Sequence, residues 1–195
     1  MLTLAIQAGG KSSRMGQDKA LMPFRGQALI QTVMARLAPL ADEIIITTNT
    51  PEHYAFLGVP LFRDIIPERG ALGGLYTALK SASHSMVAVV ACDMPFASTQ
   101  FFETATRLMS TGAADVVIPQ TEYGFEPLHA LYRREACVDP IKKALDADQW
   151  KVISWFDAVH VHALSLTETA ALDPDGLAFW NLNTPEDFVK AENLG

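Results

Sequence analysis

The sequence predicts an α/β fold, a three-layer α/β/α sandwich on a mostly parallel central sheet. Strand patterns and helical patterns alternate along the chain, which is the order that such sheets require. EIIITT (43–48) is a β-branched run and MVAVVAC (86–92) is fully apolar, and both patterns are typical of strands buried on both faces. A glycine-rich loop, AGGKSSRMGQDKA (8–20), follows directly on the first strand pattern. Open α/β sheets bind their ligands at that kind of position.

The first half of the chain contains four predicted strands, at 2–7, 43–48, 59–62 and 86–92. A helix is predicted between the first two strands, over 28–40, because five apolar residues recur there at helical spacing: Leu29, Ile30, Val33, Met34 and Leu37. Pro39 marks the end of this helix. GALGG (70–74) leads into a second helix that we expect to end near Ala82.

The second half continues the alternation. Ser98 is the predicted N-cap of a helix that presents Phe101 and Phe102 on its apolar face. Further strands are predicted at 115–119, 127–132 and 159–165, with a helix at about 134–147 and a last helix that starts at Thr184–Asp187. The strand over 127–132 is expected to add an antiparallel part. With no repeat, linker or low-complexity tract, we expect residues 1–195 to form a single domain.

Composition excludes several classes of function. The formal net charge of −7 argues against broad attachment to nucleic acid or to an anionic membrane. No stretch approaches the ~20 apolar residues of a membrane span, and the opening residues lack the basic segment of a secretory signal. Cys92 and Cys137 have no CxxC spacing, which argues against a zinc site or a disulfide framework. We therefore expect a cytoplasmic protein.

The loop after the first strand has the composition of a phosphate site. Gly9 and Gly10 leave backbone N–H groups free to face a ligand, and Lys11, Arg14 and Lys19 add positive charge. Two familiar phosphate motifs do not fit. Ala5 stands where a P-loop needs its leading glycine, and the glycines lack the G-x-G-x-x-G spacing of a dinucleotide fingerprint.

Asp93 is the most informative carboxylate in the sequence. It follows an apolar strand, so it is expected at the carboxyl edge of the sheet, where Pro95 stops further strand pairing. Asp in this setting also serves turns. Mg²⁺ is usually held by one or two carboxylates together with substrate phosphates. We therefore predict that Asp93 is a Mg²⁺ ligand.

The pattern A-G-G-x-S-x-R-M-G-x-D-K after an N-terminal strand resembles the nucleotidyltransferases of the GT-A-like superfamily, and most of all the molybdenum cofactor guanylyltransferase (MobA) family. Further blocks resemble it in the same order: Asp64 before GALGG, ACDMPF (91–96), Pro127 with the strand after it, and FWNLNTPEDF (179–188). The resemblance implies a Rossmann-like fold of the nucleotide-diphospho-sugar transferase type. Gln7 stands where the family usually has Leu, and Ala71 where it has Pro.

The resemblance also implies roles for individual residues. Residues of the first loop would surround guanine and ribose: Gln7, Ala8, Gly9 and Gly10. Arg14 and Lys19 would hold the triphosphate, Asp93 the Mg²⁺, and Asp64 would make a second acidic contact to the nucleotide. Asn181 and Asn183 would contact the acceptor, although Asn also serves turns. Either Thr47 or Asn49 would stand near the base. Glu126 and His129 would flank the acceptor, and His129 fits a core position equally well.

The implied reaction is transfer of GMP from GTP to the terminal phosphate of molybdopterin, with Mg²⁺ as cofactor and pyrophosphate as the leaving group. Transient contact with proteins that deliver molybdopterin or receive the cofactor is plausible for an unstable pterin. Three alternatives stay open. One is a molybdopterin cytidylyltransferase, another is a nucleotidyltransferase for a sugar or isoprenoid phosphate, and the third is a non-catalytic nucleotide-binding protein. A GTP hydrolase is disfavoured by the missing P-loop.

Overall fold

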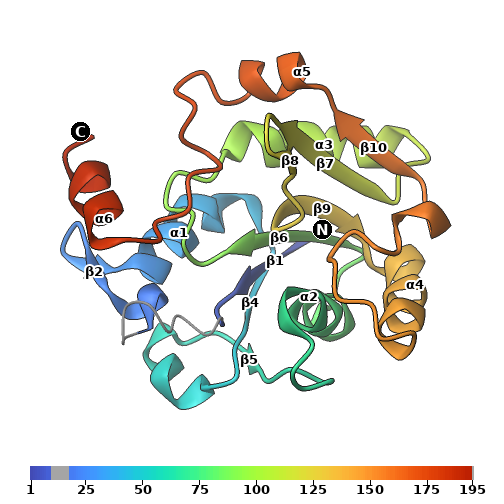
Figure 1. Cartoon of the computed structure of the whole chain (residues 1–195), viewed down its shortest axis with the longest axis horizontal. Helices are drawn as coiled ribbons and strands as arrows, with labels where there is room; N and C mark the ends of the chain where they lie inside the picture. Colours follow the sequence, from blue (N-terminus) through green and yellow to red (C-terminus); the bar gives the residue numbers. More distant parts are fainter. Residues whose placement is uncertain (10–17, 195) are drawn as a thin grey trace.

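The computed structural model describes residues 1–9 and 18–194, and an eight-stranded sheet lies at its centre (Figure 1). The strands are ordered β10 (Val161–Leu164), β7 (Val116–Thr121), β9 (His129–Arg133), β6 (Met86–Ala91), β1 (Leu2–Gln7), β4 (Glu43–Thr47) and β5 (Leu61–Phe62), while β8 (Gly124–Phe125) pairs with β7. On this path β9 alone runs antiparallel to its neighbours β6 and β7. The predicted mostly parallel sheet, with an antiparallel part near 127–132, is therefore confirmed.

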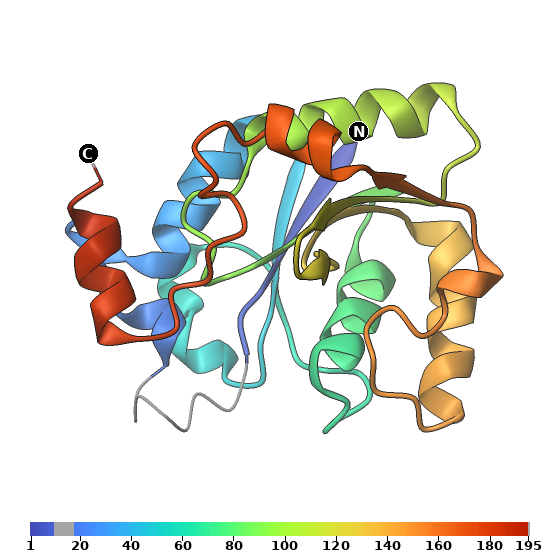
Figure 2. The ribbon, with the colours of Figure 1, turned by 45° about the horizontal axis from the view of Figure 1, so that its top comes forward.

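Helices cover both faces of the sheet (Figure 2). On one face lie α1 (Leu29–Leu37) and α3 (Thr99–Thr111), and on the other lie α2 (Gly70–Ser81) and α4 (Arg134–Asp146). Along β1, Leu4 and Ile6 belong to the core under α1 and α3, whereas Ala5 belongs to the core under α2 and α4. This alternation follows from the two-residue period of a strand. The predicted three-layer sandwich is the fold observed.

Three elements differ from the prediction. The first helix gives way to a 3-10 turn over Ala38–Leu40, which contains the helix-breaking Pro39. A hairpin of β2 (Pro23–Phe24) and β3 (Gln27–Ala28) was not predicted, and Arg25 and Gly26 in its turn have φ values of 50° and 81°. Positive φ at both central residues is typical of tight hairpin turns. The short helix α5 (Leu166–Ala171) was also missed.

The last helix, α6 (Pro185–Glu192), packs on the β2–β3 hairpin and on the start of α1. This small core contains Phe24, Leu29, Leu182, Phe188 and Ala191. Trp180 stacks on Phe96 with 6.1 Å between the ring centroids. The contacts bring the segment before α6 back beside the loop that follows β6, as Figure 1 shows. None of the helices within the described residues is long and apolar enough to cross a bilayer.

Candidate active site

The carboxyl ends of β1 and β6 form the floor of the site, and the end of β4 lies beside that of β1. Gln7 of β1 pairs with Thr47 of β4 on one side and with Ala91 of β6 on the other. Beyond the paired residues, the N–H of Ala8 donates to the carbonyl of Thr47 at 2.8 Å, and the N–H of Cys92 donates to the carbonyl of Gln7 at 3.1 Å. The chain segments that leave β1 and β6 are therefore adjacent, as ligand-binding loops of open α/β sheets are.

Lys19 enters the site from a short 3-10 helix over Lys19–Leu21. Asp18 caps this helix, because its Oδ1 accepts a hydrogen bond from the N–H of Ala20 at 3.1 Å. Its other oxygen accepts from the hydroxyl of the buried Tyr54 at 2.5 Å. Burial and the neighbouring Asp18 raise the pKa of Tyr54, so the hydroxyl stays protonated and remains a donor. Both bonds fix Asp18, and with it the start of the turn that carries Lys19.

The ammonium of Lys19 joins two segments of the chain that are distant in sequence. Its Nζ lies 2.8 Å from Oδ2 of Asp93 and 2.7 Å from Oδ1 of Asn183. The side chains of Lys19 and Asp93 are 19% and 15% exposed, so the ion pair is partly shielded and still open to a ligand. The N–H of Leu182 donates to the carbonyl of Asp93 at 3.0 Å, which holds the two segments together.

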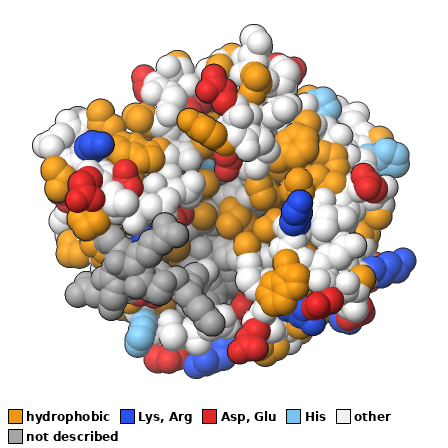
Figure 3. Space-filling model, in the orientation of Figure 1, with side chains coloured by type: hydrophobic (Ala, Val, Ile, Leu, Met, Phe, Trp, Pro, Cys, Tyr) orange, Lys and Arg blue, Asp and Glu red, His pale blue; other side chains and the backbone are white. Residues whose placement is uncertain are grey.

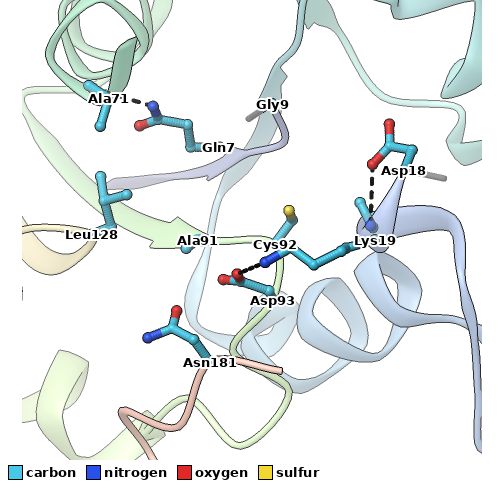
Figure 4. A pocket seen from close by; sticks show the side chains of 11 residues that line it. Gln7, Gly9, Asp18, Lys19, Ala71, Ala91, Cys92, Asp93, Leu128 and Asn181 are labelled. Carbon is cyan, nitrogen blue, oxygen red and sulfur yellow. Dashed lines mark hydrogen bonds and ion pairs between the residues drawn. The ribbon is translucent and has the colours of Figure 1, made fainter. Parts of the chain in front are cut away.

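A cavity of about 260 Å³ opens over these strand ends. Its lining comes from six parts of the chain: Gln7 and Gly9; Asp18, Lys19 and Ala20; Ala71; Ala91, Cys92 and Asp93; Leu128; and Asn181. The space-filling view shows this face hollowed near its centre, with hydrophobic side chains on the walls (Figure 3). In the close view, Lys19, Asp93 and Asn181 gather at one end of the cavity, and Gln7 lies with Ala71 at the other (Figure 4).

The cavity unites several of the predicted site residues. Gln7, Gly9, Lys19, Asp93 and Asn181 line it, and Asn183 reaches it through its bond to Lys19. Ala8 is fully buried directly behind the lining. Gly10 and Arg14, which were predicted beside them, lie outside the described residues.

Other predicted residues lie away from the cavity lining. Asp64 follows the edge strand β5, and its carboxylate accepts from Nδ2 of Asn49 at 2.8 Å. Glu126 accepts a bond from the hydroxyl of Thr121 at 3.2 Å, and its pKa is raised by partial burial. His129 is fully buried among aromatic rings and is a core residue.

The chemistry of the lining favours binding of an anion with a cation over covalent catalysis. Burial and the nearby Asp93 raise the pKa of Cys92, so this thiol stays protonated at neutral pH and is a poor nucleophile. Nowhere in residues 1–9 and 18–194 do three or more His, Cys, Asp or Glu side chains form a metal cluster. Two oxygen atoms, from Asp93 and Asn183, instead converge on one cationic position, now taken by Lys19. One carboxylate and one amide oxygen suit Mg²⁺ when substrate phosphates complete its shell.

Sequence reasoning missed Asp18 and Cys92 as parts of the site. The signal for Asp18 was present, since an Asp directly before a helical turn is a strong capping residue. Cys92 is adjacent to Asp93, and its place in the lining follows from the same strand end.

Comparison with known proteins places the chain among nucleotidyltransferases. The model of the MobA-like NTP transferase domain matches residues 4–161. A protein of Pelotomaculum thermopropionicum named as a probable molybdenum cofactor guanylyltransferase is 37% identical over 190 residues, covering 97% of this chain and 91% of that protein. The molybdenum cofactor guanylyltransferase of Desulfosudis oleivorans is 33% identical over 192 residues, covering 98% and 94%.

A solved structure has the same fold. Molybdopterin-guanine dinucleotide biosynthesis protein A from Archaeoglobus fulgidus aligns with a TM-score of 0.82 at 24% sequence identity, and the alignment covers 97% of this chain and 96% of that one. The likeness shows that the sheet order and helix layers described above are shared with that protein.

Proposed function

The chain belongs to the MobA-like NTP transferase family, and from that premise we propose that it transfers GMP from GTP to the terminal phosphate of molybdopterin. The products are molybdopterin guanine dinucleotide and pyrophosphate. The observation that carries the proposal is the convergence of Lys19, Asp93 and Asn183 at one end of a cavity over the strand ends. The names of relatives that align over nearly the whole chain support guanine and molybdopterin as the substrates.

The cavity divides into two functional ends in this proposal. Gln7, Ala8 and Gly9, with Gly10, surround the guanosine. Lys19 and Arg14 hold the triphosphate, and Asn181 lies on the side where the acceptor phosphate enters. Asp64, which accepts a hydrogen bond from Asn49 outside the cavity lining, is the second acidic contact to the nucleotide in this proposal.

The residues provide alignment and charge neutralisation. The acceptor phosphate is already largely anionic at neutral pH, because its second pKa is about 6. Its oxygen attacks the α-phosphorus of GTP, an O–P bond forms, and the bond to the β-phosphate oxygen breaks with its electron pair leaving on pyrophosphate. No general base is required, which agrees with a lining whose thiol is protonated. Lys19 moves from Asp93 to the phosphates and neutralises charge on the leaving group.

Mg²⁺ is the proposed cofactor, with Asp93 and the amide oxygen of Asn183 as the residues that would hold it. When bound, it would neutralise phosphate charge and orient the α-phosphate. Departure of Lys19 from these two oxygens would free them for the ion.

The two free cysteines, Cys92 and Cys137, fit a reducing cytoplasm as the place of the reaction. Transient contact with proteins that supply molybdopterin or take up the product is part of the same proposal.

The substitution Asp93→Asn tests the proposal. Removing the carboxylate removes the acid that pairs with Lys19 at the metal end of the cavity, so we expect Mg²⁺-dependent pyrophosphate release to fall by about 100-fold or more. The assay supplies GTP and molybdopterin and follows pyrophosphate, and thermal unfolding checks that the variant is folded. The matched control is Asp146→Asn, which removes an exposed acid paired with Lys142 on α4. Near-normal turnover of a folded Asp93→Asn variant would contradict the assignment.

A further inference from the structure

The side chain of Gln7 presents an unused hydrogen-bond acceptor at the end of the cavity remote from Lys19. Its Nε2 donates to the carbonyl of Ala71 in the first turn of α2 at 3.2 Å. Its Oε1 has no hydrogen-bond partner within the described part of the chain, although the residue is only 8% exposed. A carbonyl accepts and cannot donate, so the nitrogen of the amide must face Ala71 and the oxygen must face away from it. Figure 4 shows this arrangement.

A second unpaired polar atom lies on the same face of the sheet. Thr47 is the register partner of Gln7 on β4, and its hydroxyl is also buried without a partner among the described residues. Residues that pair directly in a sheet direct their side chains to the same face. Buried polar groups are normally satisfied, so two unsatisfied atoms at neighbouring strand ends, one of them on a residue that lines the cavity, indicate a place where a polar ligand completes the bonding.

Gly74 of α2 leaves the space that the Gln7 amide occupies. A Cβ built at Gly74 would overlap the amide nitrogen and carbon of Gln7. Glycine within a helix lowers its stability by roughly 0.5–1 kcal/mol relative to alanine. Any side chain at position 74 would therefore displace the amide from its bond to Ala71.

We propose that Gln7 is a base-specificity residue: its Oε1 accepts a hydrogen bond from the N1–H or 2-amino group of guanine, and Gly74 makes room for the amide that does so. The inference rests on the proposed function, since it names the group that reads the base at the same site. Guanine carries two adjacent donors on this edge, and an acceptor held at a fixed orientation fits them. Because the relatives' family usually has Leu at position 7, this reading would be a property of the present chain.

The test compares the affinity of the wild-type chain and of Gln7→Leu for three nucleotides, with Mg²⁺ present and the acceptor absent. The probes are GTP, ITP, which lacks the 2-amino group, and 2-aminopurine riboside triphosphate, which lacks N1–H. We expect the wild-type chain to prefer GTP over at least one analogue by about tenfold or more, because that analogue leaves Oε1 unpaired. In Gln7→Leu this preference should disappear. A preference that survives in Gln7→Leu, or that is missing from the wild-type chain, overturns the proposal.

Gly74→Ala gives an independent variant that leaves Gln7 in place. In the wild-type background, Gly74→Ala should reduce the preference for GTP over its analogues. In a chain that already carries Gln7→Ala it should have no further effect, because no amide is left to displace. The matched control is Lys80→Ala, an exposed position on the same helix, which should keep the wild-type preference. An equal effect of Gly74→Ala in both backgrounds overturns the proposal. A wild-type chain that binds no GTP would instead refute the proposed function.

Discussion

Lys19 contacts residues that are 74 and 164 positions away from it in the chain. The ammonium of Lys19 thus lies between a carboxylate and an amide oxygen, and both contacts hold it at the cavity. The ion pair of Lys19 and Asp93 is partly buried, so both groups lose part of their hydration. Because the pair is still partly exposed, phosphate oxygens of a ligand can compete with Asp93 for the ammonium of Lys19. Lys19, one of the two residues that hold the triphosphate in our proposal, is therefore also the residue whose ammonium lies against Asp93 and Asn183.

His129 is a different kind of residue, buried and unpaired. Its ring stacks on Phe102 at 4.8 Å between centroids and meets Phe101 and Phe179 edge-on at 5.2 and 4.9 Å. Neither ring nitrogen has a partner within the described residues. Burial, helped by the charge of Arg36, lowers the pKa of His129 to about 3. The imidazole is therefore neutral in the folded protein and takes no part in proton transfer at neutral pH.

The lowered pKa predicts how stability depends on pH. In the unfolded chain His129 titrates near 6.5, so between pH 6.5 and about 3 the unfolded state binds the additional proton. The stability that the neutral, buried His129 provides is fully present above pH 6.5. The free energy of unfolding then falls by about 1.4 kcal/mol per pH unit as pH falls toward 3. His129→Phe keeps the aromatic packing and removes the titration. We expect its free energy of unfolding, measured in denaturant from pH 7 to 4.5, to fall less steeply than that of the wild-type chain.

The matched control is His162→Gln, which removes an exposed histidine on β10 and should leave the wild-type slope unchanged. Parallel slopes for His129→Phe and the wild-type chain would show that His129 is not the group responsible.

Local pattern predicted the placement of Gln7 and Asp93 because their positions at strand ends follow from one rule, whereas Lys19 was predicted from the composition of the loop after β1. A residue directly after a parallel strand must lie at the carboxyl edge of the sheet. Asp64 obeys the same rule, but its strand is at the sheet edge, two strands from β1, so it lies away from the cavity lining. The bond from Lys19 to Asn183 exists because the C-terminal segment packs beside the loop that follows β6. This packing is a long-range contact, so no local sequence pattern could predict it.

The C-terminal helix α6 positions two asparagines of the site. Asn181 and Asn183 precede it directly, and Thr184 caps it by accepting from the N–H of Asp187 at 3.1 Å. Phe188 on α6 meets Phe24 of the β2–β3 hairpin, with 6.3 Å between ring centroids. The docking of α6 on this hairpin therefore sets where the asparagines lie relative to Lys19.

Phe188→Ala tests this coupling. Truncating a buried Phe typically costs 3–5 kcal/mol, so we expect a loss of about 3 kcal/mol in stability together with a lower rate of transfer. Chemical denaturation gives the first quantity, and pyrophosphate release below the unfolding transition gives the second. The control is Val189→Ala, which changes an exposed neighbour on the same helix and should alter neither. If Phe188→Ala lost stability but kept the wild-type rate, α6 would not position the asparagines.

The elements that sequence reasoning missed have physical causes. The strands β2 and β3 are two residues each, too short for a periodic signal, and their turn uses Arg25 in the conformation that usually selects Gly or Asn. The helix α5 is also short, but Ser165 and Glu168 form a capping box that was readable in the sequence. Strands with β-branched or apolar runs, such as β4 and β6, were predicted because burial on both faces favours such patterns.

At the scale of the whole molecule, the site is assembled from segments near both ends and the middle of the chain. Four segments meet at the site only when the sheet has formed and α6 has packed on the β2–β3 hairpin. They are residues 7–9, 18–19, 91–93 and 181–183. The molecule has a formal net charge of −7, yet the ligand we propose is an anion. Lys19 at the cavity therefore acts against the overall field, and binding should weaken as salt screens its charge.

The central claim is tested most directly by product mass from a panel of nucleotides and acceptors. The wild-type chain is incubated with Mg²⁺, with GTP, CTP or UTP, and with or without molybdopterin, and the products are weighed by mass spectrometry. We predict one dinucleotide, molybdopterin plus GMP, formed only from GTP with the acceptor present and accompanied by an equal amount of pyrophosphate. A faster transfer from CTP or UTP, or no dinucleotide from GTP, would contradict the account.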